Sequence, residues 1–166
     1  CVAIGAAGTG LIAMTANMQA KNGAVVNFYI PGEYKQALAD GKTVKLTMDT
    51  EYPVGDTAKI KVCTDADNAF ALSLRIPAWS ADTTLALNAQ MVDVTPGKYV
   101  ELNRVWKCGD TVELFLDMRT AVLHPDEDGL PDENSKHHVA LRRGPLILAR
   151  DARLDDLHRP VQIAED

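Results

Sequence analysis

The chain has 166 residues, of which 46% are hydrophobic and 24% charged, a composition that is ordinary for a globular protein with a buried core. Its formal net charge of −6 argues against a nucleic-acid partner, because binding phosphates requires clustered lysine and arginine. No apolar run approaches the roughly 20 residues that cross a bilayer, so no membrane partner is expected. The sequence begins at Cys1, without an initiator Met or a basic signal-like start, which predicts a processed protein or a piece of a larger one.

The first 20 residues are small, apolar and uncharged. Leu11, Met14 and Met18 recur at helical spacing, which predicts a short buried helix after the glycines at 5–10. Those glycines also suggest a nucleotide-binding turn. However, the segment has neither the G-x-G-x-x-G order nor a P-loop lysine, and no βαβ pattern follows it. Helix packing or a tight turn is therefore the favoured interpretation.

From Gly23 onward, apolar and polar residues alternate with a period of two, which predicts strands with one face in a core and the other in water. The alternating runs are 24–30, 43–49, 59–63, 70–76, 85–87, 100–102 and 112–118. Turn residues such as Asp40-Gly41 and Pro96-Gly97 separate them, and no helical stretch intervenes that could make crossovers. The sequence therefore predicts an all-β fold, an antiparallel β-sandwich with a short N-terminal helical segment.

The region after residue 118 is predicted to be organised differently. A polar loop at 125–136 precedes two further strands, 137–143 and 145–150, which are hinged at Gly144-Pro145. The charged tail at 151–166 is predicted to be irregular.

Three cysteines are present, Cys1, Cys63 and Cys108, so at least one is unpaired if a disulfide forms. Their wide spacing matches no zinc pattern of the C-x-x-C type. Free thiols at Cys63 and Cys108 are the favoured interpretation, and the redox compartment stays open.

Asp126, Asp128 and Asp132 resemble part of a calcium-binding loop. In that register His124 stands where the first Asp belongs and Ser135 where the closing Glu belongs, so two oxygen ligands are missing. A solvated surface loop is the favoured interpretation, and calcium is not expected.

Other candidate groups are weaker. His137 and His138 are adjacent on a predicted strand and must point to opposite faces, so they are not expected to share a metal. Trp79 and Trp106 lie beside turns and could stack on a sugar, because flat apolar rings suit sugar faces. Packing in the core or at a sheet edge is the alternative for both. No Ser-His-Asp order and no acid/base carboxylate pair stands out.

Five phrases occur in order along the chain: VVNFYIPGE at 25–33, TMDTEYP at 47–53, LRIPAW at 74–79, YVELNRVWKCGD at 99–110 and VALRRGPL at 139–146. Together they resemble the non-catalytic C-terminal half of glycoside hydrolase family 127, the β-L-arabinofuranosidase-like enzymes. The resemblance covers roughly residues 20–150.

This resemblance implies that a catalytic (α/α)₆ barrel precedes the chain. Residues 1–20 would be a remnant of its last helix, residues 21–118 the middle β-sandwich, and residues 119–166 an acidic loop, return strands and tail. Cys1 matches one member of a cysteine pair that supplies a thiolate nucleophile and zinc ligands in the family. The sequence departs from the family at Ile4-Gly5-Ala6-Ala7, where an Asn-Gly-Pro-Arg-like stretch often stands.

The leading hypothesis is a non-catalytic sandwich portion of a glycoside hydrolase whose full-length parent acts on plant-type glycans. Its expected partner is the catalytic barrel of the same polypeptide, with zinc only in that parent and with no cofactor in this chain. A homodimer through the exposed N-terminal segment and a secreted or periplasmic parent are further expectations. The alternatives are a carbohydrate-binding module that uses Trp79 or Trp106, and an adhesion-type sandwich.

Overall fold

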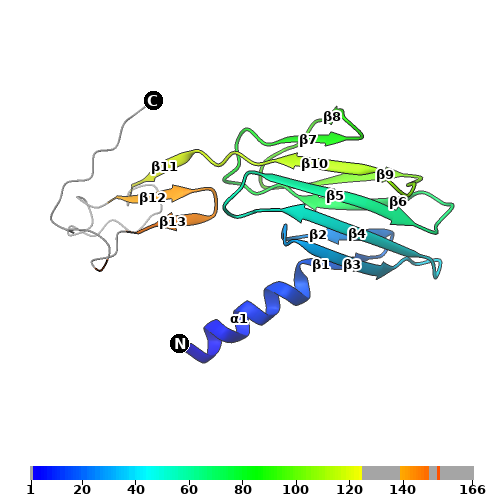
Figure 1. Ribbon diagram of the computed structural model, residues 1–166, viewed down its shortest axis with the longest axis horizontal. Coiled ribbons are helices and arrows are strands. Elements are labelled where there is room, and N and C mark those ends of the chain that lie inside the picture. Colours follow the sequence, from blue (N-terminus) through cyan, green and yellow to red (C-terminus); the bar gives the residue numbers. More distant parts are fainter. Residues whose placement is uncertain (1, 125–138, 150–152, 154–166) are drawn as a thin grey trace. The chain divides into compact units, whose positions relative to one another are not determined.

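The computed structural model describes residues 2–124, 139–149 and 153. In this part of the chain one N-terminal helix is followed by strands (Figure 1). The elements are α1 (Val2–Thr15), β1 (Asn17–Ala20), β2 (Gly23–Val26), β3 (Gly32–Ala37), β4 (Thr43–Thr50), β5 (Thr57–Thr64), β6 (Phe70–Arg75), β7 (Thr84–Leu87), β8 (Gln90–Val92), β9 (Tyr99–Arg104), β10 (Thr111–Phe115), β11 (Thr120–Leu123), β12 (Ala140–Arg143) and β13 (Leu146–Leu148). The chain divides into two units, Cys1–Met118 and Arg119–Asp166.

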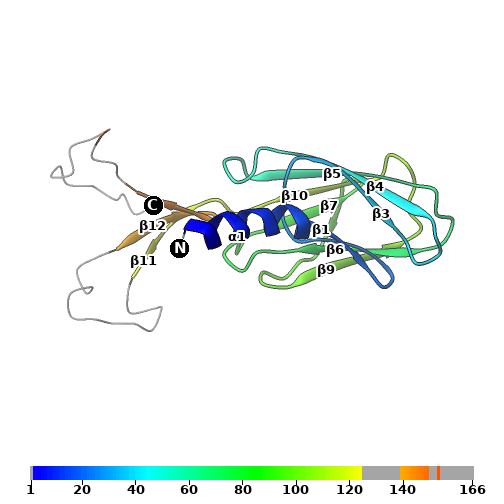
Figure 2. The same ribbon diagram turned by 90° about the horizontal axis from the view of Figure 1, so that it is seen from below.

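The first unit contains two sheets that pack face to face (Figure 2). One has the strand order β1-β2-β6-β9 and the other the order β3-β4-β5-β10-β7-β8. Apolar side chains from both sheets fill a single core, among them Val26, Val44, Leu46, Ile60, Leu72, Leu74, Leu85, Val112 and Leu114. The prediction of an all-β sandwich is confirmed, and residues 43–118 contain no helix.

The period-two alternation has the predicted cause. Along β4, the side chains of Val44, Leu46 and Met48 are buried, whereas Lys45 and Asp49 on the other face are exposed. The exposed face of this sheet carries ion pairs between neighbouring strands, Lys45 with Glu33 at 2.7 Å and Lys59 with Glu113 at 2.5 Å. Such exposed pairs contribute little to stability, so core burial accounts for the strands.

One strand pairing corrects the prediction of purely antiparallel sheets. β2 runs parallel to β6, with Gly23 opposite Ala71 and Val26 opposite Leu74. Gly23 has a φ of 152°, and a Cβ atom there would lie 1.8 Å from the Ala71 carbonyl oxygen. The close approach of the two backbones therefore requires glycine at the start of β2.

Several strand boundaries also differ from expectation. The run at 24–30 leaves the sheet after Val26, and β1, β3 and β8 were not predicted. β3 is an edge strand whose residues are mostly exposed and polar, so it has no alternating pattern. β8 follows a two-residue turn in which Asn88 and Ala89 have φ values of 49° and 65°, although neither is glycine.

The prediction of a short buried helix after the N-terminal glycines was wrong in two respects. α1 includes those glycines and ends at Thr15, so Met18 lies on β1 instead of in the helix. Its apolar side chains are exposed: Ile4 by 79%, Leu11 by 57% and Met14 by 76%. In the described part of the chain, no helix is long and apolar enough to span a membrane.

The second unit contains a three-stranded antiparallel sheet in the order β11-β12-β13. The strands predicted at 137–143 and 145–150 are present in shorter form as β12 and β13, joined at Gly144, whose φ is 56°. β11 was not predicted. The polar loop and the charged tail lie outside the described residues.

Candidate functional site

Cys63 and Cys108 form a disulfide, which corrects the prediction of free thiols. The antiparallel pairing of β5 with β10 places Lys61 opposite Thr111, and the backbone bonds between Val62 and the Gly109–Asp110 turn continue this register. The two cysteines therefore meet across the strand pair although 45 positions separate them.

A zinc site is what the resemblance implies for the parent, with Cys1 as one ligand. Cys1 lies outside the described residues, and the disulfide leaves Cys63 and Cys108 without a thiolate to offer. In residues 2–124, 139–149 and 153, no three His, Cys, Asp or Glu side chains lie close enough together to hold a metal ion. The described residues therefore do not fit a zinc centre by themselves.

The candidate calcium ligands Asp126, Asp128 and Asp132 lie outside the described residues, as do His137 and His138. His124, the position before them, is exposed at the end of β11. The calcium prediction is therefore untested.

The two tryptophans have different environments. Trp106 is only 2% exposed, its Nε1 donates a hydrogen bond to the Phe70 carbonyl at 3.1 Å, and the ring centres of these two residues are 6.1 Å apart. The Arg104 guanidinium lies over the same ring at 5.5 Å. Trp106 is thus a core residue, in agreement with the core packing that the sequence offered as the alternative to sugar stacking. Trp79 is half-buried against the core and remains an untested candidate.

A polar cluster around Asn27, which we call the helix junction, fixes the end of α1 to the four-stranded sheet. The backbone N–H of Asn27 donates to the Ala16 carbonyl at 2.8 Å, and its side-chain Nδ2 donates to the Thr15 carbonyl at 2.8 Å. The Tyr99 hydroxyl donates to Asn27 Oδ1 at 2.5 Å. The last carbonyls of a helix lack partners within it, so Asn27 supplies what the end of α1 needs.

Aromatic rings and one cation surround this helix junction. The Arg75 guanidinium lies 5.7 Å from the centre of the Phe28 ring, and the Tyr29 hydroxyl donates to the Arg75 carbonyl at 2.6 Å. The Tyr29 and Tyr52 rings meet edge to face. Burial, partly offset by the Arg75 charge, raises the pKa of Tyr29 above its usual value, and burial also raises the pKa of Tyr52.

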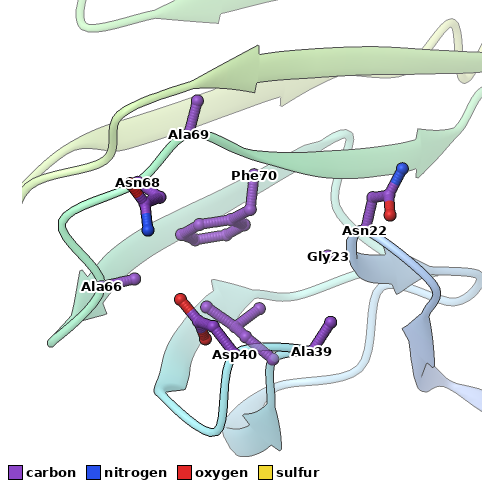
Figure 3. Close-up of a pocket in the computed structure, with 9 residues that line it drawn as sticks. Asn22, Gly23, Ala39, Asp40, Ala66, Asn68, Ala69 and Phe70 are labelled. Carbon is purple, nitrogen blue, oxygen red and sulfur yellow. The ribbon is translucent and has the colours of Figure 1, made fainter.

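A pocket of about 220 Å³ opens at the opposite end of β6 (Figure 3). Phe70, the first residue of β6, lies at its floor with Leu38 and Ala66, whereas Arg75 at the other end of β6 belongs to the helix junction. The polar side chains of Asn22, Asp40 and Asn68 line the pocket from three separate segments. These are the β1–β2 turn, the β3–β4 turn and the β5–β6 connection.

Sequence reasoning identified neither the helix junction nor this pocket. Asn27, Tyr99 and Arg75 all belong to the phrases that carry the family resemblance, and that was the available signal for the junction. The pocket residues come from turns of ordinary composition. Only the strand pairings place those turns together, so the sequence offered no comparable signal for the pocket.

The comparisons with known proteins agree on one family. The family model described as the middle domain of GH127 beta-L-arabinofuranosidase matches residues 23–118. A GH127 beta-L-arabinofuranosidase from Geobacillus stearothermophilus T6 has 28% identity and a TM-score of 0.71, covering 82% of this chain and 21% of its own. A solved glycoside hydrolase has 28% identity and a TM-score of 0.69, with 80% and 22% covered.

A GH127 beta-arabinofuranosidase structure is also similar, with 27% identity, a TM-score of 0.64, and coverage of 75% of this chain and 22% of its own. No curated protein matched the sequence. The chain thus spans about a fifth of the length of these solved relatives. Because the family model covers more than half of the sequence, the chain belongs to the GH127 β-L-arabinofuranosidase family, with residues 23–118 as its middle domain.

Proposed function

We propose that this chain is a non-catalytic β-sandwich portion of a β-L-arabinofuranosidase-like glycoside hydrolase, and that it supports the catalytic domain of the same polypeptide. In the full-length parent the substrate would be a plant-type glycan. The observation that carries the proposal is α1, a helix with apolar side chains exposed along its length and held firmly at one end.

The composition of α1 is typical of a helix that packs against other parts of a protein. Val2–Thr15 contains no charged residue, and Ile4, Leu11, Ile12 and Met14 are all exposed large hydrophobic side chains. A helix that is apolar all round is normally buried within a protein. Exposed apolar surface of this kind marks an interaction site.

The proposed cover is the catalytic domain. The chain matches only about a fifth of each solved relative, so most of such an enzyme lies outside the matched segment. The helix junction adds a second reason. Asn27 binds both the Thr15 and Ala16 carbonyls, so any domain that packs on α1 would be held in a fixed relation to the sandwich.

The test compares the full-length polypeptide with the 166-residue chain on a chromogenic β-L-arabinofuranoside. We expect turnover by the full-length protein and none by the short chain. Leu11→Glu in the full-length protein should sharply lower both activity and thermal stability, because a charge would be buried against the catalytic domain. Met91→Glu, at a residue of β8 that is 68% exposed, is the matched control and should change neither.

Turnover by the 166-residue chain alone would overturn the non-catalytic assignment. A full-length protein in which Leu11→Glu behaves like Met91→Glu would overturn the proposed contact through α1. A carbohydrate-binding module that depends on tryptophan is less well supported, because the Trp106 ring is buried in the core.

A further inference from the structure

We propose that the pocket at the start of β6 binds a single sugar residue of a glycan, at the end of the sandwich opposite the helix junction. This goes beyond the proposed function, since a domain that only supports its neighbour needs no ligand. The site uses Phe70 as its apolar floor and the side chains of Asp40 and Asn68 as its polar contacts, with Asn22 and Gly23 at its edge (Figure 3).

The floor of the pocket is apolar and largely buried. Phe70, Leu38 and Ala66 are each exposed by only 6–7%, so they offer a limited surface at the base. Phe70 is held from behind by Trp106, which donates a hydrogen bond to the Phe70 carbonyl and packs against its ring. An aromatic ring fixed in this way suits the apolar C–H face of a sugar.

The polar groups above this floor have unused hydrogen-bonding capacity. Within the described residues, the amide side chain of Asn68 forms no hydrogen bond, and Asp40 accepts only one, from the Lys42 backbone N–H at 3.0 Å through Oδ1. The amide can donate and accept, and the carboxylate accepts through its second oxygen. Neighbouring hydroxyls of a sugar need this mixture of donors and acceptors.

The volume of the pocket and the charge of its lining limit the class of ligand that it can bind. A cavity of about 220 Å³ lies below the roughly 300–1,000 Å³ of pockets for drug-sized ligands, so it accommodates one small ring. Asp40 is the one charged residue among the described residues that line it, which disfavours phosphate and other anions. The remaining lining is neutral, so an uncharged polyol with an apolar face fits better than an organic cation.

The test is an NMR titration of the 166-residue chain with L-arabinose, methyl β-L-arabinofuranoside and methyl β-D-glucopyranoside. We expect saturable shifts of the backbone amides of Gly23, Ala39 and Ala69, together with a change in Trp106 fluorescence in a Trp79→Phe background. Asn68→Ala should weaken binding at least fivefold, and Ala39→Phe should abolish it by filling the pocket. Asp67→Ala is the matched control, because Asp67 is exposed on the same connection but does not line the pocket.

Absence of shifts with all three sugars, up to their solubility limits, would overturn the proposal. Equal weakening by Asn68→Ala and Asp67→Ala would overturn it as well, as would shifts that centre on Trp79. Stronger shifts with methylammonium than with any sugar would show an amine site instead. Arabinofuranosidase turnover is not measured here, so failure of this site is distinguishable from failure of the proposed function.

Discussion

Asn27 joins the end of α1 to the sandwich through several hydrogen bonds. Its backbone N–H, both side-chain polar atoms and its carbonyl contact Ala16, Thr15, Tyr99 and Arg75, the last at 3.5 Å. The residue is half-buried, so a lost partner is only partly replaced by water. Substituting Asn27 should therefore lower the free energy of unfolding by more than the loss of one ordinary hydrogen bond does.

We predict that Asn27→Ala lowers the free energy of unfolding by about 1–3 kcal/mol, because it leaves the Thr15 carbonyl and the Tyr99 hydroxyl without their partner. Tyr99→Phe removes one of these bonds and should cost only about 0.5–1.5 kcal/mol. Urea unfolding measures both. Equal effects of the two variants would mean that the contact with the helix end contributes nothing.

The disulfide is a second feature that depends on single residues. Cys63 and Cys108 close a loop with a sequence separation of 45, and cross-links of that size typically contribute roughly 2–4 kcal/mol by restricting the unfolded chain. We predict that the Cys63→Ser/Cys108→Ser double variant is less stable by about this amount in thermal and urea unfolding. The wild-type protein in excess reductant should match the double variant, and unchanged stability on reduction would contradict the prediction.

At the scale of elements, α1 differs from the strands because it has a single firm attachment. Its interior contains Gly5, Gly8 and Gly10, which each weaken a helix by about 1 kcal/mol relative to alanine. A 14-residue helix without tertiary partners is marginal in water. The stability of α1 is thus expected to depend on the domain or chain that packs against it.

We predict that, in the monomeric 166-residue chain, the amides of α1 exchange hydrogen rapidly while those of β4, β5 and β6 are protected. Deleting residues 1–14, which keeps the Thr15 carbonyl that Asn27 binds, should move the unfolding temperature of the sandwich by less than about 2 °C, since core burial begins with Ala16 and Ala24. Sedimentation must accompany the exchange experiment. Strong protection of α1 in a monomer would contradict this prediction.

The helix and the strands differ in how well they could be predicted from the sequence. β4, β5, β6 and β10 were predictable because each has one face in the core and one in water, which leaves a period of two. β1 and β3 lie at sheet edges and contain no fully buried residue, so neither leaves such a pattern. α1 was placed too late in the chain because the helix was predicted to begin after the glycines, whereas the uncharged sequence at 2–15 forms one continuous helix that includes them.

Contacts between segments that are distant in the sequence were harder to predict. The pairing of Cys63 with Cys108 follows once β5 and β10 are aligned, but period-two patterns do not specify which strands are neighbours. The parallel pairing of β2 with β6 is of the same kind. The family resemblance did not specify these contacts either, although two of its phrases, VVNFYIPGE and LRIPAW, meet at the helix junction through Asn27 and Arg75.

At the scale of the whole molecule, the buried core described here lies within the first unit, and the burial of Tyr29 makes the stability of that unit depend on pH. The hydroxyl of Tyr29 is bonded to the Arg75 carbonyl at 2.6 Å, and the side chain is 2% exposed. Burial disfavours the phenolate and raises the pKa of Tyr29 in the folded protein above the value of about 10 for an unfolded chain. The unfolded state therefore loses this proton first as pH rises.

The sign of the effect follows from that difference. Below pH 10 both states keep the proton and the full stability is present, whereas above about pH 10 only the unfolded chain releases it and the free energy of unfolding falls. We predict a steep loss of stability in urea unfolding as the pH rises above about 10 for the wild type, and a shallower loss for Tyr29→Phe. Tyr29→Phe should start from lower stability at pH 8, because the Arg75 carbonyl loses its donor. The two proteins differ in no other ionisable group, so parallel curves would show that Tyr29 does not govern the alkaline limit of the fold.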